Sequence, residues 1–159
     1  MSLESVRAWL EAHAPDLRLI EGHQSTATVA DAAAALGVGP ERIAKTLAIR
    51  AGEETFLLVA RGDARLSNAK CKAGFGARPR MLGPDETLAL TGHPVGGVCP
   101  FGLATPLPVY LDLSLQAFDL VYPAAGSRTS SVALTPERLF ALVGSRWVDL
   151  CTVPEGEAS

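Results

Sequence analysis

A glycine-rich loop is the first segment of this sequence whose residues could carry chemistry. Residues 92–102 contain four Gly and two Pro. Gly lets backbone N–H groups approach a ligand without interference from a Cβ atom, and Pro94 and Pro100 would hold those donors in place. Aligned N–H donors can bind an anion or stabilise an oxyanion. The loop lacks the motifs of a P-loop and of a dinucleotide-binding turn, and the alternative is an ordinary surface loop.

Cys99 lies within this loop and could act as a nucleophile, with His93 or His23 as its base. Thiol catalysis needs a lowered pKa and a positioned partner, so the alternative is a small, packed Cys. The three His, at 13, 23 and 93, show no metal-ligand spacing, and His13 fits the exposed end of a first helix. We therefore expect no metal site and no cofactor.

Lys45 is the second candidate for a functional side chain. It lies inside the apolar run 43–49, where a helical pattern changes to a strand pattern. A Lys between apolar residues either lies near a pocket or extends its aliphatic stem until the ammonium reaches water. Lys45 alone leaves both interpretations open.

The charges are distributed unevenly along the chain. Between Arg42 and Arg80 lie nine basic and three acidic residues, a net charge of +6, whereas the remainder carries five basic and fourteen acidic residues, a net charge of −9. A basic segment in an acidic protein suits a surface that meets a polyanion. The alternative is that these side chains are simply solvated.

Length and composition favour one globular domain over residues 1–159, with a frayed tail at 155–159. Of the 159 residues, 48% are apolar and 19% are charged, which allows a sizeable core and argues against disorder. No apolar stretch reaches the roughly 20 residues of a membrane span, and no signal peptide is visible. Three widely spaced Cys, at 71, 99 and 151, do not form a disulfide scaffold. We expect a cytoplasmic protein.

Helical and strand patterns alternate along the chain, which predicts a mixed α/β (α+β) fold with much antiparallel pairing. Thr28 and Gly37 have the positions of helix caps, and residues 51–54 predict the turn of a hairpin. The expected helices cover 3–14, 28–36, 40–44, 67–75, 83–92 and 135–144. The expected strands cover 17–20, 46–49, 55–60, 109–113, 120–122, 130–134 and 147–150.

These segments, taken together and in this order, resemble the YbaK/prolyl-tRNA synthetase-associated (INS-like) editing family, the trans-acting aminoacyl-tRNA deacylases. The resemblance extends over residues 15–150. The loop 91–103 resembles the family's signature Gly-x-x-x-Pro motif, here at Gly96 and Pro100. The other matching stretches are the helix and Lys-Thr-Leu strand within 28–47 and the C-terminal segments 107–112, 125–126 and 134–139.

The resemblance implies a largely antiparallel, YbaK-like sheet or barrel surrounded by helices. It also implies hydrolysis of the ester that joins a wrong amino acid to the 3′-terminal adenosine of a tRNA, often the proline tRNA. Small side chains such as those of Ala, Cys, Ser or 2-aminobutyrate would be removed, either by water or by a group of the substrate itself. The partners would be the acceptor end of tRNA and an aminoacyl-tRNA synthetase, with no membrane; the oligomeric state stays open.

The resemblance also assigns roles to particular residues. Lys45 would hold the terminal phosphate or the adenosine of the substrate. The backbone of the loop would contact the ester carbonyl through Gly96, Gly97, Val98, Cys99 and Pro100. Further substrate-binding residues are expected at His23, Ser25, Thr26, His93, Phe101, Gly126 and Ser131.

Two departures from the family pattern and two other functions bear on this expectation. Cys99 stands where the family often has Ser, and Ser131 stands where some Cys-specific members have an acidic residue. The first favours a structural role for the Cys99 side chain, and the second argues against specificity for Cys-tRNA. The other functions are a non-catalytic tRNA- or synthetase-binding module of the same fold and a thiol hydrolase centred on Cys99.

Overall fold

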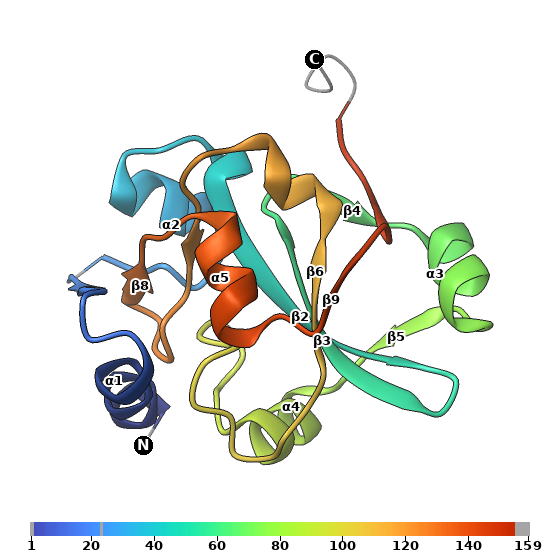
Figure 1. Ribbon diagram of the computed structural model, residues 1–159, viewed down its shortest axis with the longest axis horizontal. Coiled ribbons are helices and arrows are strands. Elements are labelled where there is room, and N and C mark those ends of the chain that lie inside the picture. The colour runs from blue at the N-terminus through green and yellow to red at the C-terminus, as the bar shows by residue number, and fades with distance from the viewer. Residues whose placement is uncertain (1, 23, 155–159) are drawn as a thin grey trace.

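A computed structural model of the chain describes residues 2–22 and 24–154 (Figure 1). His23 and the tail expected at 155–159 lie outside the described residues. Within the described part of the chain, no helix is long and apolar enough to cross a membrane.

A six-stranded sheet forms the centre of the molecule. Its strands are β2 (Ile43–Ala51), β3 (Glu54–Arg61), β5 (Pro79–Met81), β6 (Val109–Asp112), β7 (Tyr122–Pro123) and β9 (Arg146–Val148). The order is β5-β2-β3-β6-β9, with β7 also paired to β2. β3 and β5 are antiparallel to β2, whereas β7 is parallel to β2, β6 to β3 and β9 to β6. The sheet is therefore mixed; β5 and β7 share one edge and β9 forms the other.

Helices and two small antiparallel sheets surround the central sheet. The helices are α1 (Ser2–His13), α2 (Val29–Leu36), α3 (Asn68–Phe75), α4 (Pro84–Thr91) and α5 (Pro136–Val143), with 3₁₀ turns η1 (Pro40–Arg42) and η2 (Leu113–Ala117). One small sheet pairs β1 (Leu19–Glu21) with β8 (Ser130–Val132), and the other pairs β4 (Arg65–Leu66) with β10 (Cys151–Thr152). In Figure 1, α1 and α2 lie at the opposite side of the molecule from α3.

The apolar core lies on both faces of the central sheet. Alternate residues of a strand point to opposite faces, so Leu57 and Val59 of β3 pack with α1 and α5, whereas Phe56 and Leu58 pack with α3 and β10. β3 is buried along most of its length, as expected for a strand with neighbours on both sides and layers on both faces. α2 packs separately on Ile43, at the start of β2.

The expected mixed fold is confirmed, and local signals placed most helix ends correctly. The Thr28 hydroxyl accepts a hydrogen bond from the Asp31 N–H at the start of α2, and Gly37 ends this helix with a φ of 69°. Ser67 and Thr135 cap α3 and α5 in the same way. A side-chain cap needs only a hydroxyl three residues from a free N–H, so it can be read from adjacent sequence.

Of the sheet or barrel that was expected, the central sheet has the open form. Some local details of the expected fold are wrong. The helix expected at 40–44 is a single 3₁₀ turn, because Ile43 and Ala44 already pair with Tyr122 and Pro123 as the start of β2. The short strands β4, β5 and β10 were not expected. They have only two or three residues each, too few for an alternating pattern to stand out in the sequence.

Candidate functional site

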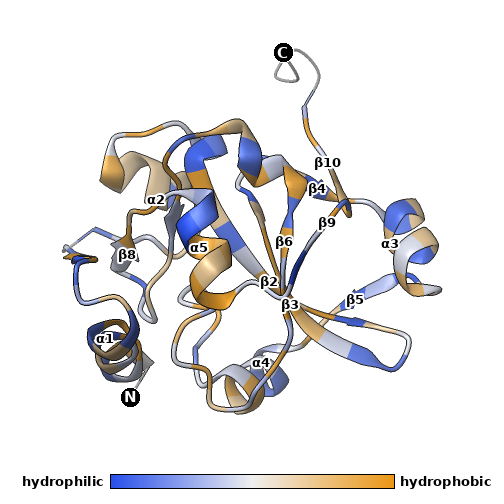
Figure 2. Cartoon of the chain, viewed as in Figure 1, coloured by the Kyte–Doolittle hydropathy of each residue, from blue (hydrophilic) through white to orange (hydrophobic). Residues whose placement is uncertain are grey.

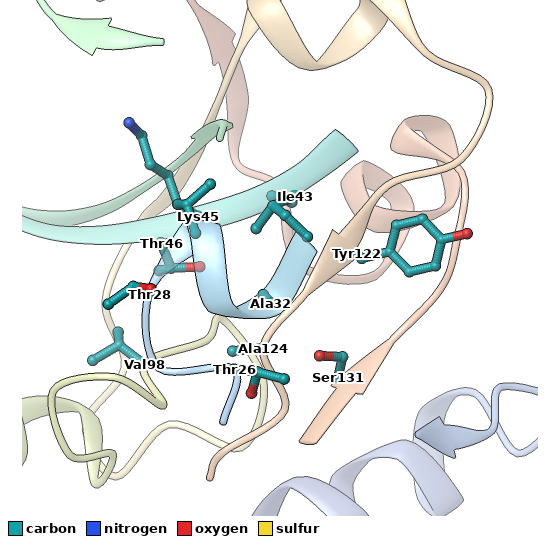
Figure 3. Close-up of a pocket in the computed structure, with 12 residues that line it drawn as sticks. Thr26, Thr28, Ala32, Ile43, Lys45, Thr46, Val98, Tyr122, Ala124 and Ser131 are labelled. Carbon is teal, nitrogen blue, oxygen red and sulfur yellow. The ribbon is translucent and has the colours of Figure 1, made fainter. Parts of the chain in front are cut away.

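A small pocket opens beside β2, between the loop that precedes α2 and the glycine-rich loop (Figure 3). Its cavity volume is about 60 Å³, which is room for only a few groups the size of a water molecule. Among its lining residues are Thr26, Lys45, Thr46, Val98 and Ser131. These residues come from separate parts of the sequence, so only the folded chain creates the pocket.

The pocket exists because β2 is not paired along its whole length on one side. β7 pairs with Ile43 and Ala44, and β5 pairs with residues 49–51 of the same strand. Neither strand pairs with Thr46, which lies between these two segments. Val98 of the glycine-rich loop and Thr46 line this pocket together, and both also line an adjoining pocket of about 240 Å³. The loop therefore lies across the gap in the sheet.

The glycine-rich loop begins with a tight turn over residues 94–97. The N–H of Gly97 donates to the carbonyl of Pro94 at 2.9 Å, and Gly96, at the third position of the turn, has a φ of 93°. A positive φ at this position is typical of a type II turn and favours Gly. A Cβ atom on Gly97 would lie 3.1 Å from backbone atoms of Ser127, so the loop packs closely on the segment before β8. Arg128 fixes the turn by donating from Nε to the carbonyl of Val95 at 3.2 Å.

Some backbone donors of the loop are available for a ligand, among them those of the partly exposed Gly96 and Val98. The N–H groups of Gly96, Val98 and Cys99 have no hydrogen-bond partner among residues 2–22 and 24–154. The N–H of Gly97 is not available, because it closes the turn on Pro94. The loop therefore has the donors that an oxyanion site requires, of which Val98 lines the pocket itself.

Lys45 also lines the pocket, and it is the only charged residue among the described residues that do so. In Figure 3 its ammonium extends away from Thr46, Val98 and Ser131. The ammonium donates to the carbonyl of Ala64, and burial lowers the pKa of Lys45. To contact a ligand in the pocket, this ammonium must exchange the carbonyl of Ala64 for the ligand.

Cys99 and His93 are buried in the core rather than exposed in the pocket, and each is 0% exposed. The Nε2 of His93 lies 2.7 Å from the carbonyl of Phe101 and 3.6 Å from the Cys99 sulfur. A carbonyl only accepts, so Nε2 carries the proton and cannot take one from the thiol. Burial also raises the pKa of Cys99 to about 12. A buried, protonated thiol does not meet the requirements of a nucleophile.

Cys99→Ala is therefore expected to keep any hydrolytic activity within a few-fold and to remove an alkaline sensitivity. The pKa of the Cys99 thiol is about 12 in the folded protein and about 8.5 in the unfolded chain. The buried thiol therefore makes its full contribution to the free energy of unfolding below the pKa of the unfolded chain. That contribution is lost as the pH rises toward the pKa of the folded protein. At pH 10 the loss for Cys99 amounts to about 2 kcal/mol. Denaturant unfolding of both proteins at neutral and alkaline pH measures it, and an equal loss in the variant would contradict this account.

Most of the basic residues between Arg42 and Arg80 are not free for a polyanion. Arg42, Arg50, Arg61, Lys70 and Arg80 each lie within 4.0 Å of an Asp or Glu carboxylate. Three exposed members of the segment form no ion pair with another described residue: Arg65, Lys72 and Arg78. Figure 2 shows hydrophilic residues on α3, which carries Lys72. The expectation of a broad basic surface is therefore reduced to a few exposed side chains.

The structure brings together only some of the residues singled out in the sequence. Lys45, Val98, Thr26 and Ser131 line the pocket, and Gly96 lines the adjoining one. The remaining described candidates do not line either pocket. Three of them are buried in or beside the loop: Gly97, Pro100 and Gly126. Three others lie in the core, namely Cys99, His93 and Phe101, and Ser25 is exposed.

Ser25 and Phe101 do not line the pocket. The Ser25 hydroxyl donates to the carboxylate of Asp31 at 3.3 Å and accepts from the N–H of Ala27, so it organises the start of α2. Phe101 is fully buried and packs on Trp9 of α1. Both side chains are used within the fold.

Thr46 is the most informative lining residue that the sequence analysis did not single out. It lies between Ala44 and Ala48 on one face of β2, where the only other polar residue is Arg50 near the end of the strand. The sequence pattern that could have identified Thr46 is a hydroxyl residue at every second position from a small apolar residue, with Ala44 before it and Ala48 after it. Ile43, Tyr122 and Ala124 complete the walls and gave no such signal.

The structure therefore combines a mixed fold with a small pocket that lies next to backbone N–H groups without partners in the described chain. No group of three or more His, Cys, Asp or Glu in the described part of the chain could hold a metal ion. The chain belongs to the aminoacyl-tRNA editing domain family, whose model matches residues 23–142.

Individual relatives agree with this family. The uncharacterized protein YwhH of Bacillus subtilis (strain 168) is 47% identical over 153 residues, which cover 95% of this chain and 98% of that protein. The proline–tRNA ligase of Geobacter sp. (strain M21) is 34% identical over 133 residues, which cover 82% of this chain and 23% of the ligase. A crystal structure of a candidate trans-editing enzyme for prolyl-tRNA synthetase has a TM-score of 0.86 at 34% identity, covering 95% of this chain and 97% of that one.

Proposed function

We propose that this protein is an aminoacyl-tRNA deacylase that hydrolyses the ester of proline tRNA carrying a small, wrong amino acid. The observation that carries the proposal is the position of Val98, which lines the small pocket while its backbone N–H has no partner in the described chain. An amino-acid side chain in the pocket would bring its ester carbonyl next to this donor. A trans-acting editing role is also supported by the likeness to the candidate trans-editing structure.

The size of the pocket accounts for selectivity against a larger correct amino acid. A cavity of about 60 Å³ has room for only a few groups the size of a water molecule, so a small side chain would fit it more easily than the ring of proline. Exclusion by size, with hydrolysis of what enters, is the logic of a second sieve. The terminal adenosine, on the other side of the ester, would have room in the adjoining pocket of about 240 Å³. Thr46 and Val98 line both pockets.

Backbone donors supply the chemistry that ester hydrolysis needs. Attack on the carbonyl by water, or by a hydroxyl of the substrate, places negative charge on its oxygen. A preorganised donor stabilises this charge by roughly 2.7–4 kcal/mol, so no side-chain nucleophile is required. Lys45 would bind the terminal phosphate or the adenosine after leaving the carbonyl of Ala64.

The test is hydrolysis of proline tRNA charged with Ala, Ser, Cys or 2-aminobutyrate, with correctly charged Pro-tRNA as the control. We expect release of at least one small amino acid and no release of Pro. Because the exposed Arg65, Lys72 and Arg78 would meet only a few phosphates, KM should rise with salt by less than for an extensive nucleic-acid interface. Binding of tRNA without release of any amino acid would instead identify a non-catalytic module.

A further inference from the structure

The pocket contains hydroxyl groups that the fold itself does not use. The side-chain oxygens of Thr26 and Thr46 are buried and have no hydrogen-bond partner in the described part of the chain. Ser131, from β8, is only 2% exposed and lines the same pocket. In Figure 3 the hydroxyl oxygens of Thr46 and Ser131 both point toward the middle of the group of lining residues.

The surroundings of these hydroxyls are small and apolar. Ala32, Ile43, Val98 and Ala124 contribute much of the remaining wall. No carboxylate lines the pocket among the described residues, and the ammonium of Lys45 donates to the carbonyl of Ala64. A few polar groups in an otherwise apolar cavity are typical of a site that fixes the orientation of one polar ligand group.

Burying a hydroxyl without a partner is unfavourable, so these hydroxyls need an explanation. Val could fill the place of Thr46 on the strand with the same shape and without the unpaired oxygen. Hydroxyls both donate and accept, so a ligand hydroxyl could bond with two of them at once. A ligand methyl group in the same place would leave them unpaired.

We propose that the pocket selects a side chain that ends in a hydroxyl, so that the seryl ester is the preferred substrate over the alanyl and 2-aminobutyryl esters. This inference rests on the proposed function and extends it to the class of side chain removed. Ser and 2-aminobutyrate differ only by a hydroxyl in place of a methyl group, so size cannot separate them. A thiol is a weaker donor and a larger group, which places Cys behind Ser.

The expected size of the effect follows from hydrogen bonds to two pocket hydroxyls. Each bond contributes a factor of about ten, so kcat/KM for the seryl ester should exceed that for the 2-aminobutyryl ester by about 100-fold. Thr46→Val and Ser131→Ala should each reduce this ratio about tenfold, mainly by slowing hydrolysis of the seryl ester. Because the Thr46 hydroxyl has no partner within the described chain, Thr46→Val should leave the melting temperature unchanged or raise it.

The experiment compares the seryl, 2-aminobutyryl and alanyl esters of proline tRNA on the full chain and its variants. Thr55→Val is the matched control, because Thr55 lies on β3, accepts from Arg50 Nε at 3.0 Å and does not line the pocket. This control should keep the wild-type ratio of the seryl to the 2-aminobutyryl rate.

Three results would overturn the inference and can be told apart. If wild-type protein hydrolyses the 2-aminobutyryl ester as fast as the seryl ester, the hydroxyls are not recognition groups and the deacylase assignment stands. If no ester is hydrolysed, the proposed function fails and this inference fails with it. A lower melting temperature for Thr46→Val would show that its hydroxyl has a structural bond, which also contradicts the inference.

Discussion

Gly96→Ala is expected to lower kcat for deacylation about 100-fold, because misplacing a reacting group by about 1 Å has an effect of this size. Gly96 has a φ of 93°, which L side chains rarely adopt, and an added Cβ would lie 3.1 Å from the Cβ of Ala27 and 3.3 Å from Nε of Arg128. The turn over residues 94–97 must then rearrange. The N–H groups of Val98 and Cys99 follow directly after this turn and would lose their alignment.

A second Gly→Ala substitution provides the matched control. Gly74 lies in α3, on the other side of the sheet from the pocket, and a Cβ there would meet only Leu150 at an ordinary 3.7 Å. Gly74→Ala should raise the free energy of unfolding by about 0.5–1 kcal/mol and leave kcat unchanged. Single-turnover hydrolysis and thermal unfolding measure both effects. Wild-type turnover in Gly96→Ala would show that the loop donors are not the oxyanion site.

Lys45→Ala is expected to raise KM for the mischarged tRNA by about 10- to 100-fold, the size of one lost charge-assisted hydrogen bond. Lys45 is the only charged residue among the described residues that line the pocket. Its half-buried ammonium has the carbonyl of Ala64 as a partner, and burial lowers its pKa. To bind a phosphate at the pocket, the ammonium would turn from the carbonyl of Ala64, and a charge-assisted bond to the phosphate would replace that contact.

The matched control for Lys45 is Lys72→Ala, which removes the same charge from an exposed position on α3. It should change KM by less than a factor of three, because a single screened surface charge contributes about 0–1 kcal/mol. The melting temperature of each variant separates lost binding from lost structure, since Lys45→Ala also removes the bond to Ala64. Undiminished hydrolysis by a folded Lys45→Ala protein would remove Lys45 from the mechanism.

Some features of the glycine-rich loop could be predicted from the sequence, and others could not. The density of Gly and Pro correctly predicted a constrained loop, and Gly96 has the positive φ that its residue type allows. Composition could not show that Gly97 uses its N–H to close the turn. It also could not show that the Cys99 thiol and His93 turn into the core. Which way a side chain faces depends on what packs over the loop, here the first helix and the segment before β8.

Local signals by themselves determined the helix ends, the β2–β3 hairpin and the mixed class of the fold, because caps and turns involve residues a few positions apart. Only the tertiary structure decided which residues share a pocket. Thr26, Thr46 and Ser131 lie far apart in sequence and meet because β7 and β5 leave the middle of β2 unpaired and β8 folds back beside it. The unpaired hydroxyls of Thr26 and Thr46 are a property of that burial, since the same residues on a solvated strand would bind water.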